Sequence, residues 1–181
     1  MTAPTSKRTN TALLVPLVIG AVVAVALGVY GNLHSPTGVA VNIAGFSSTQ
    51  AVKAWLATVA VLFAVVQLLS ALAMYGKFGN APAWVGPLHR WSGRLAFLVS
   101  VPVAMHCLYA LGFQSFDTRV LVHSLLGCFF YGAFVCKMLV LRHDDAPGWV
   151  LPVVGGAVFT GLVGLWLSAS LWFFTKSGLT F

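Results

Sequence analysis

Acidic residues are nearly absent from this chain of 181 residues. Only Asp117, Asp144 and Asp145 carry a carboxylate side chain, so a catalytic cleft built on several carboxylates is excluded. Charged residues of either sign make up 7% of the chain, whereas a soluble domain carries about 25%. An ordinary soluble domain is therefore excluded, and so is a disordered chain, which needs high charge and low hydrophobicity.

Clustered basic residues and paired cysteines are also lacking. The ten Lys and Arg residues are scattered singly through apolar sequence, whereas a nucleic-acid-binding protein gathers them on one face. Cys107, Cys128 and Cys136 lie in apolar runs without the spacing of a zinc site, a redox pair or a covalent haem attachment. We therefore expect no nucleic-acid partner, and we interpret the cysteines as small buried hydrophobic residues.

Apolar sequence is what the chain has in abundance. Hydrophobic residues make up 59% of it, and the mean hydropathy is +0.93. A transmembrane helix needs about 20 mostly apolar residues, and five stretches meet that length. The sequence therefore predicts an all-α integral membrane protein, one membrane domain over residues 1–181, with five transmembrane helices in an antiparallel bundle. The expected helices are 13–30, 52–75, 91–111, 120–141 and 150–174, with a turn-rich connection over 76–88.

The distribution of basic residues predicts the orientation, because cytoplasmic ends of membrane helices are enriched in Lys and Arg. With the N-terminus inside and the C-terminus outside, seven basic residues lie at cytoplasmic ends and three at external ends. The first group is Lys7, Arg8, Lys77, Arg90, Arg94, Lys137 and Arg142, and the second is Lys53, Arg119 and Lys176.

The fifth expected helix carries a stripe of small residues. Gly156, Thr160, Gly164 and Ser168 follow one another at intervals of four. Small residues at this period allow helix backbones to approach closely in lipid. We interpret the stripe as a packing face.

Two intramembrane histidines are the strongest candidates for chemistry. His106 precedes the expected turn between the third and fourth helices, and His123 follows it at a similar distance. Their depths in the membrane should therefore match, as two axial ligands of a haem b require. Arg119 lies one turn from His123, nearer the surface, where a haem propionate would meet a cation. The alternative is that the two histidines only form hydrogen bonds across helices.

Other polar residues are weaker candidates. A second haem would use His89 and His143, but His143 falls on the opposite helix face from His123 and in a hydrophilic run. Gln67 is expected to form a hydrogen bond with a neighbouring helix or to contact a quinone head group. His34 lies just beyond the first expected helix. We expect it to be either a solvated loop residue or a proton carrier for quinone chemistry.

The stretch LHRWSGRLAF over residues 88–97, followed by His106, resembles the first haem-binding helix of cytochrome b561-like and ferric-reductase-like membrane domains. The resemblance covers residues 89–143. It implies that His106 and His123 ligate haem b and that His89 is a possible further ligand. The ferric-reductase pattern has a shorter interval between its histidines than the 16 residues that separate His89 from His106. The resemblance therefore supports one haem better than two.

Together these features predict a membrane cytochrome b subunit that carries electrons through haem b. Its partners would be membrane lipid, a quinone or another acceptor, and an iron–sulfur, copper or flavin protein in a larger complex or oligomer. The chain has no GxGxxG fingerprint for a nicotinamide or flavin cofactor. We therefore expect an electron-transfer subunit of the plasma membrane rather than a complete enzyme. The alternative from another class is a haem-free membrane anchor or assembly subunit.

Overall fold

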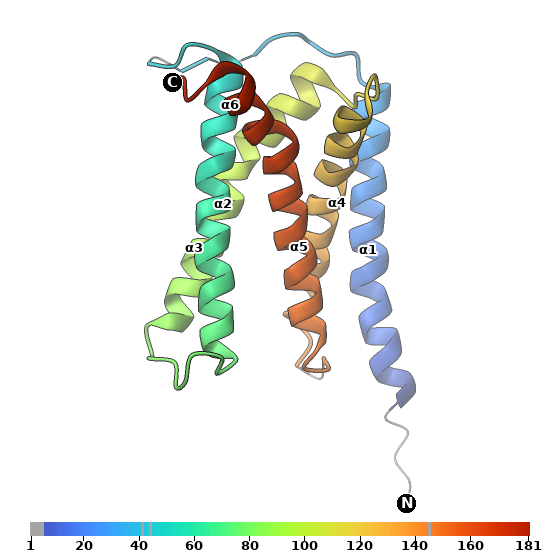
Figure 1. Cartoon of the computed structure of the whole chain (residues 1–181). Coiled ribbons are helices and arrows are strands. Elements are labelled where there is room, and N and C mark those ends of the chain that lie inside the picture. The colour runs from blue at the N-terminus through green and yellow to red at the C-terminus, as the bar shows by residue number, and fades with distance from the viewer. Residues whose placement is uncertain (1–5, 41, 44, 145) are drawn as a thin grey trace, which may run out of the picture. The chain divides into compact units, whose positions relative to one another are not determined.

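The computed structural model describes residues 6–40, 42–43, 45–144 and 146–181, and all of its regular elements are helices. Five of these helical segments are long and apolar enough to cross a membrane, so the prediction of an all-α protein with five transmembrane helices is confirmed. In chain order the elements are α1 (Ser6–Leu33), α2 (Thr49–Met74), α3 (Val85–Met105), the π-helix η1 (His106–Leu111), α4 (Thr118–Val140), α5 (Val150–Trp166), the π-helix η2 (Leu167–Leu171) and α6 (Trp172–Ser177) (Figure 1).

The third helix begins earlier than the sequence predicts. It starts at Val85 rather than near Trp91, so the expected irregular connection ends at Trp84. Pro87 does not prevent this start, because it is the third residue of the helix, where a backbone N–H has no acceptor within the helix. The prediction of irregular structure up to residue 88 is therefore wrong.

The chain forms two compact units. Unit 1 consists of Met1–His34 and Phe113–Gly161, and unit 2 of Ser35–Gly112 and Leu162–Phe181. Unit 1 thus contains α1, α4 and the first part of α5, whereas unit 2 contains α2, α3, η1, the end of α5, η2 and α6.

Within unit 1, α1 and α4 pack through a contact between two glycines. A Cβ added at Gly132 would lie 2.5 Å from the carbonyl oxygen of Gly20, and one added at Gly20 would lie 2.6 Å from the carbonyl oxygen of Gly132. Further towards the end of α1, Gly28 faces the Cys128 sulfur. Residue numbers rise along α1 as they fall along α4, so the two helices are antiparallel. The backbones meet directly, as is typical of helix packing in membranes.

Within unit 2, α2 and α3 also pack through small side chains. On α3, Ser92, Ala96 and Ser100 are buried at intervals of four residues, and Ala60 and Ala64 are buried on α2. The end of α5 joins this pair through the Trp166 indole N–H, which donates to the Thr58 hydroxyl at 2.9 Å. The close packing in unit 2 therefore depends on a small-residue stripe of α3.

The small-residue stripe predicted on the fifth helix does not form a packing face along its whole length. Gly156 and Thr160 are exposed, and an added Cβ at Gly156 would meet nothing within 4 Å. The neighbouring Gly161 is buried instead. A Cβ atom added at Gly161 would lie 3.3 Å from the Phe129 ring of α4. The helix is turned so that Gly161 faces α4, and the prediction is wrong for Gly156 and Thr160.

Candidate functional site

His106 lies at a change of helix type in unit 2. The α-helical part of α3 ends at Met105, and His106 is the first residue of η1. Its side chain is half-buried. The carbonyls of Tyr109 and Ala110 accept hydrogen bonds from the backbone N–H groups of Thr37 and Gly38, at 3.3 and 3.1 Å, which anchors the end of η1. Short π-helical segments within α-helices are frequent at functional sites.

His123 lies in the second turn of α4, in unit 1, and is also half-buried. The start of this helix is well defined, because the Asp117 carboxylate caps it by accepting from the Val120 N–H at 2.8 Å. Ser124 further ties the preceding connection to the helix, since its hydroxyl lies 3.2 Å from the Gln114 N–H and 2.9 Å from the Gln114 carbonyl. The Asp117 cap and the Ser124 contacts therefore fix where α4 begins, and with it the position of His123 in the helix.

Arg119, the predicted propionate partner, forms an ion pair with Asp117. The guanidinium Nη2 lies 3.8 Å from the carboxylate, and the two side chains are 34% and 45% exposed. An ion pair at this distance and exposure contributes little to stability. Asp117 therefore competes weakly with any other anion for the Arg119 guanidinium. This ion pair was not predicted from the sequence, although the two residues are only two positions apart.

The histidine pair is divided between the units: His106 belongs to unit 2 and His123 to unit 1. Each lies the same number of residues from the helix end next to the Gly112–Asp117 connection. His106 is five residues before Leu111, and His123 is five residues after Thr118. In α4 this corresponds to about 7.5 Å along the axis, and in the π-helical η1 to a shorter rise, because each turn holds more residues. The register of both residues matches the prediction, and their pairing around one group stays a prediction.

His89 takes part in a polar cluster on the facing sides of α2 and α3. Its Nδ1 lies 2.9 Å from the Ser70 hydroxyl and 3.1 Å from the Gln67 carbonyl. The Gln67 side-chain amide donates to the His89 carbonyl. A Cβ at Gly93 would collide with that amide, so a larger residue there would force the Gln67 side chain to move. The predicted hydrogen bond of Gln67 to a neighbouring helix is therefore confirmed.

The cluster also favours one tautomer of His89. A carbonyl can only accept, so the contact with Gln67 is a hydrogen bond when Nδ1 carries the proton. The Ser70 hydroxyl is compatible with this, because it donates to the Val66 carbonyl at 2.7 Å and can accept from Nδ1. The remaining nitrogen, Nε2, then carries the lone pair.

The other two histidines lie at helix ends. The His34 ring stacks on Tyr30 with a centroid distance of 5.1 Å and an interplanar angle of 9°. His143 is exposed, two residues beyond the C-cap of α4. Among the residues that the structure describes, no three His, Cys, Asp or Glu side chains gather as metal ligands would.

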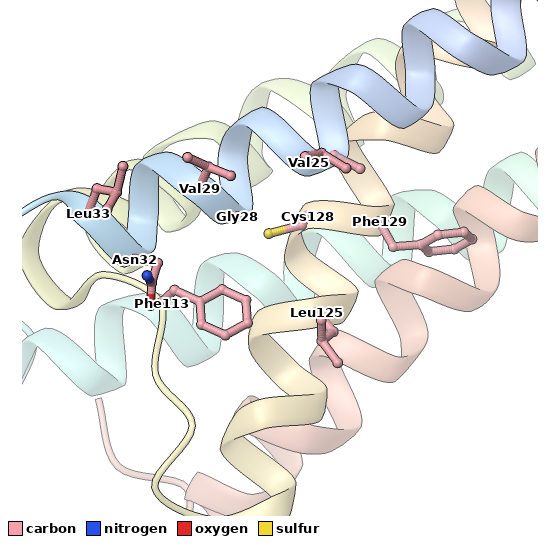
Figure 2. Close-up of a pocket in the computed structure, with 10 residues that line it drawn as sticks. Val25, Gly28, Val29, Asn32, Leu33, Phe113, Leu125, Cys128 and Phe129 are labelled. Atoms are coloured by element: carbon pink, nitrogen blue, oxygen red, sulfur yellow. The ribbon is translucent and has the colours of Figure 1, made fainter.

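A cavity of about 660 Å³ lies between α1 and α4 in unit 1. Figure 2 shows the Cys128 sulfur directed towards Gly28, with Asn32 and Phe113 at one end of the cavity. Asn32 is the one strongly polar side chain in its lining, and none of the lining residues is a histidine. The cavity is thus an apolar groove, separate from the predicted haem ligands.

The fold defines a class of protein, a multi-pass membrane protein with five apolar helices. Residues 13–181 match the model of a family of unknown function, DUF6529, and the chain belongs to this family. Comparisons with curated proteins and with solved structures find no match.

Proposed function

We propose that this protein is a membrane cytochrome b, in which His106 and His123 are the axial ligands of one haem b. The observation that supports the proposal is the equal placement of the two histidines, each five residues from the helix end beside the Gly112–Asp117 connection. Intramembrane ionisable residues are costly and are usually retained for function. Two histidines at corresponding positions of consecutive helices would provide two nitrogen ligands to one haem iron.

The donor set fits such a group. Neutral imidazole nitrogen is a common axial ligand of haem iron, and two histidines suffice. When bound, haem b supplies reversible one-electron transfer. His106 and His123 would hold this group through their ring nitrogens, and Arg119 would provide a cation for a propionate. The apolar helices that carry these residues would exclude water and lower the dielectric constant, which influences the reduction potential.

The decisive experiment is the visible spectrum of the full-length protein, purified from haem-replete cells, before and after reduction with dithionite. We expect the sharp reduced bands of a low-spin, six-coordinate b-type haem, at a ratio of one haem per chain. A colourless preparation would contradict the proposal and favour the haem-free membrane anchor. Two haems per chain would mean that His89 is also a ligand.

The distribution of basic residues predicts on which side of the membrane the proposed haem lies. With the N-terminus in the cytoplasm of a plasma membrane protein, the Gly112–Asp117 connection lies outside. The proposed haem is then close to the external surface, and its partner is an extracytoplasmic iron–sulfur or copper protein or a quinone in the outer leaflet. A cytoplasmic flavoprotein would be too distant without a second haem.

Labelling of an introduced cysteine tests this orientation. Ser115 is exposed in the connection before α4, so we expect Ser115→Cys, in a background with the three native cysteines replaced, to react with a membrane-impermeant maleimide in intact cells. Thr58→Cys, within the membrane span of α2, is the matched unreactive control. Reaction only in inverted vesicles would reverse the orientation and place the redox partner in the cytoplasm.

A further inference from the structure

Two arginines near the start of α3 form a basic site in unit 2. Arg90 and Arg94 are one helical turn apart and both are exposed. All three acidic residues of the chain, Asp117, Asp144 and Asp145, belong to the sequence of unit 1, so unit 2 has no carboxylate side chain to pair with these arginines. The two guanidinium groups are therefore available to an anion from outside the unit.

Arg94 belongs to the most exposed apolar stripe of its helix. Trp91, Leu98 and Met105 lie on the same face and are 59%, 62% and 58% exposed, as side chains in contact with lipid would be. An arginine in such a stripe is costly unless its charge reaches the headgroup layer. Its guanidinium lies over the Trp91 ring, 5.0 Å from the centroid, towards the N-terminal end of the helix. The side chain thus extends towards the membrane surface along an aromatic ring.

The length of the helix places this pair at the boundary of the hydrocarbon layer. The span Val85–Leu111 has 27 residues, or about 40 Å, whereas the hydrocarbon core measures about 30 Å. Roughly two turns of the helix therefore lie outside the core. Arg90 lies in the second turn of α3, and its Nη1 is 3.7 Å from the Cβ position of Gly86 in the first. Because this excess is shared by the two ends of the helix, Arg90 lies near the boundary, and Arg94, one turn further in, reaches it through a side chain that extends along Trp91.

We propose that Arg90 and Arg94 bind the headgroup phosphate of one anionic phospholipid, whose acyl chain lies along Leu98. Two planar guanidinium groups suit the oxygens of a phosphodiester. A lipid is favoured over free phosphate because the stripe that contains Arg94 continues into the membrane as apolar side chains. It is favoured over an acidic protein segment because one phospholipid meets both parts of the stripe, the headgroup at the arginines and the acyl chain along Leu98. The inference does not depend on the proposed haem.

Native mass spectrometry of the full chain, supplied with equal amounts of phosphatidylglycerol and phosphatidylcholine, tests this site. We expect one phosphatidylglycerol to be retained in preference to phosphatidylcholine. Arg90→Gln with Arg94→Gln should reduce that preference by about thirtyfold, the effect expected of two basic residues near an anionic lipid surface. The matched control is Arg142→Gln, an exposed arginine of unit 1 that should change nothing. Helical content by circular dichroism shows whether each variant folds.

A second pair of variants separates the geometry from the charge. Arg90→Lys with Arg94→Lys keeps both charges and loses the planar fork, so an intermediate preference supports the proposal. Three outcomes would overturn it: no preference in the unaltered protein, an unchanged preference in the folded double Gln variant, or displacement of the lipid by millimolar inorganic phosphate. The last would identify a site for free anions rather than for lipid.

Discussion

Replacing either His106 or His123 with alanine is expected to abolish the absorption of bound haem, whereas replacing His143 should leave it intact. Both proposed ligands lie five residues inside their helices, and His143 lies exposed beyond the end of α4. Removal of one axial imidazole would leave the iron without one of its two protein ligands, so we expect the haem to be lost during purification. The measurement is haem per protein, by pyridine haemochrome assay, in each purified variant.

The comparison contains its own control for folding. His143→Ala changes the same residue type just beyond the end of α4, and each variant can be tested for monodispersity in detergent. Full haem content in the folded His106 and His123 variants would disprove their role as ligands. Haem loss in the His143 variant alone would show that a different pair binds it.

The second large effect is expected at the glycine contact of unit 1. In Gly132→Ala, the new Cβ would lie 2.5 Å from a backbone oxygen of α1, so the helices must separate. Overpacking of this kind costs about 1–3 kcal/mol, and Gly132→Leu should cost more. The free energy of unfolding in detergent, measured by denaturant titration followed by tryptophan fluorescence, should fall accordingly.

The matched control is Gly155→Ala on α5, where an added Cβ meets nothing within 4 Å. There we expect no loss and a small gain, since alanine is the better helix former. Equal stability of Gly132→Ala and the unaltered protein would contradict the direct contact between the α1 and α4 backbones.

The sequence predicts the five membrane helices well, because span length and apolar composition are local properties. The start of α3 is predicted poorly, since Gly86 and Pro87 normally mark a turn and here occupy the first helical turn. The pairing of helices is not predictable from periodicity. The five membrane-spanning helices are mostly apolar around their circumference, so the packing faces are selected by individual small residues such as Gly20, Gly132 and Ala96.

The candidate site likewise has features that the sequence predicts and features that it does not. The distance of His106 and His123 from their helix ends follows from counting residues, and the structure agrees with the count. The π-helical turn that begins at His106 has no signal in the sequence that we recognise. The ring orientation of His89 depends on Ser70 and Gln67 of another helix, and such contacts between distant residues appear only once the helices are paired.

The discontinuity of unit 1 bears on how the chain assembles during synthesis. α2 and α3 are consecutive, so their hairpin can form as soon as both have entered the membrane. α1 leaves the ribosome before α2 and α3, but its partner α4 follows only after this hairpin, and contacts of such high sequence separation form late. Until α4 is inserted, the surface of α1 around Gly20 therefore faces lipid. Other helices can bind this surface in place of α4, because it allows direct contact between backbones. We expect this interval to be the step at which misassembly occurs and at which a membrane chaperone would act.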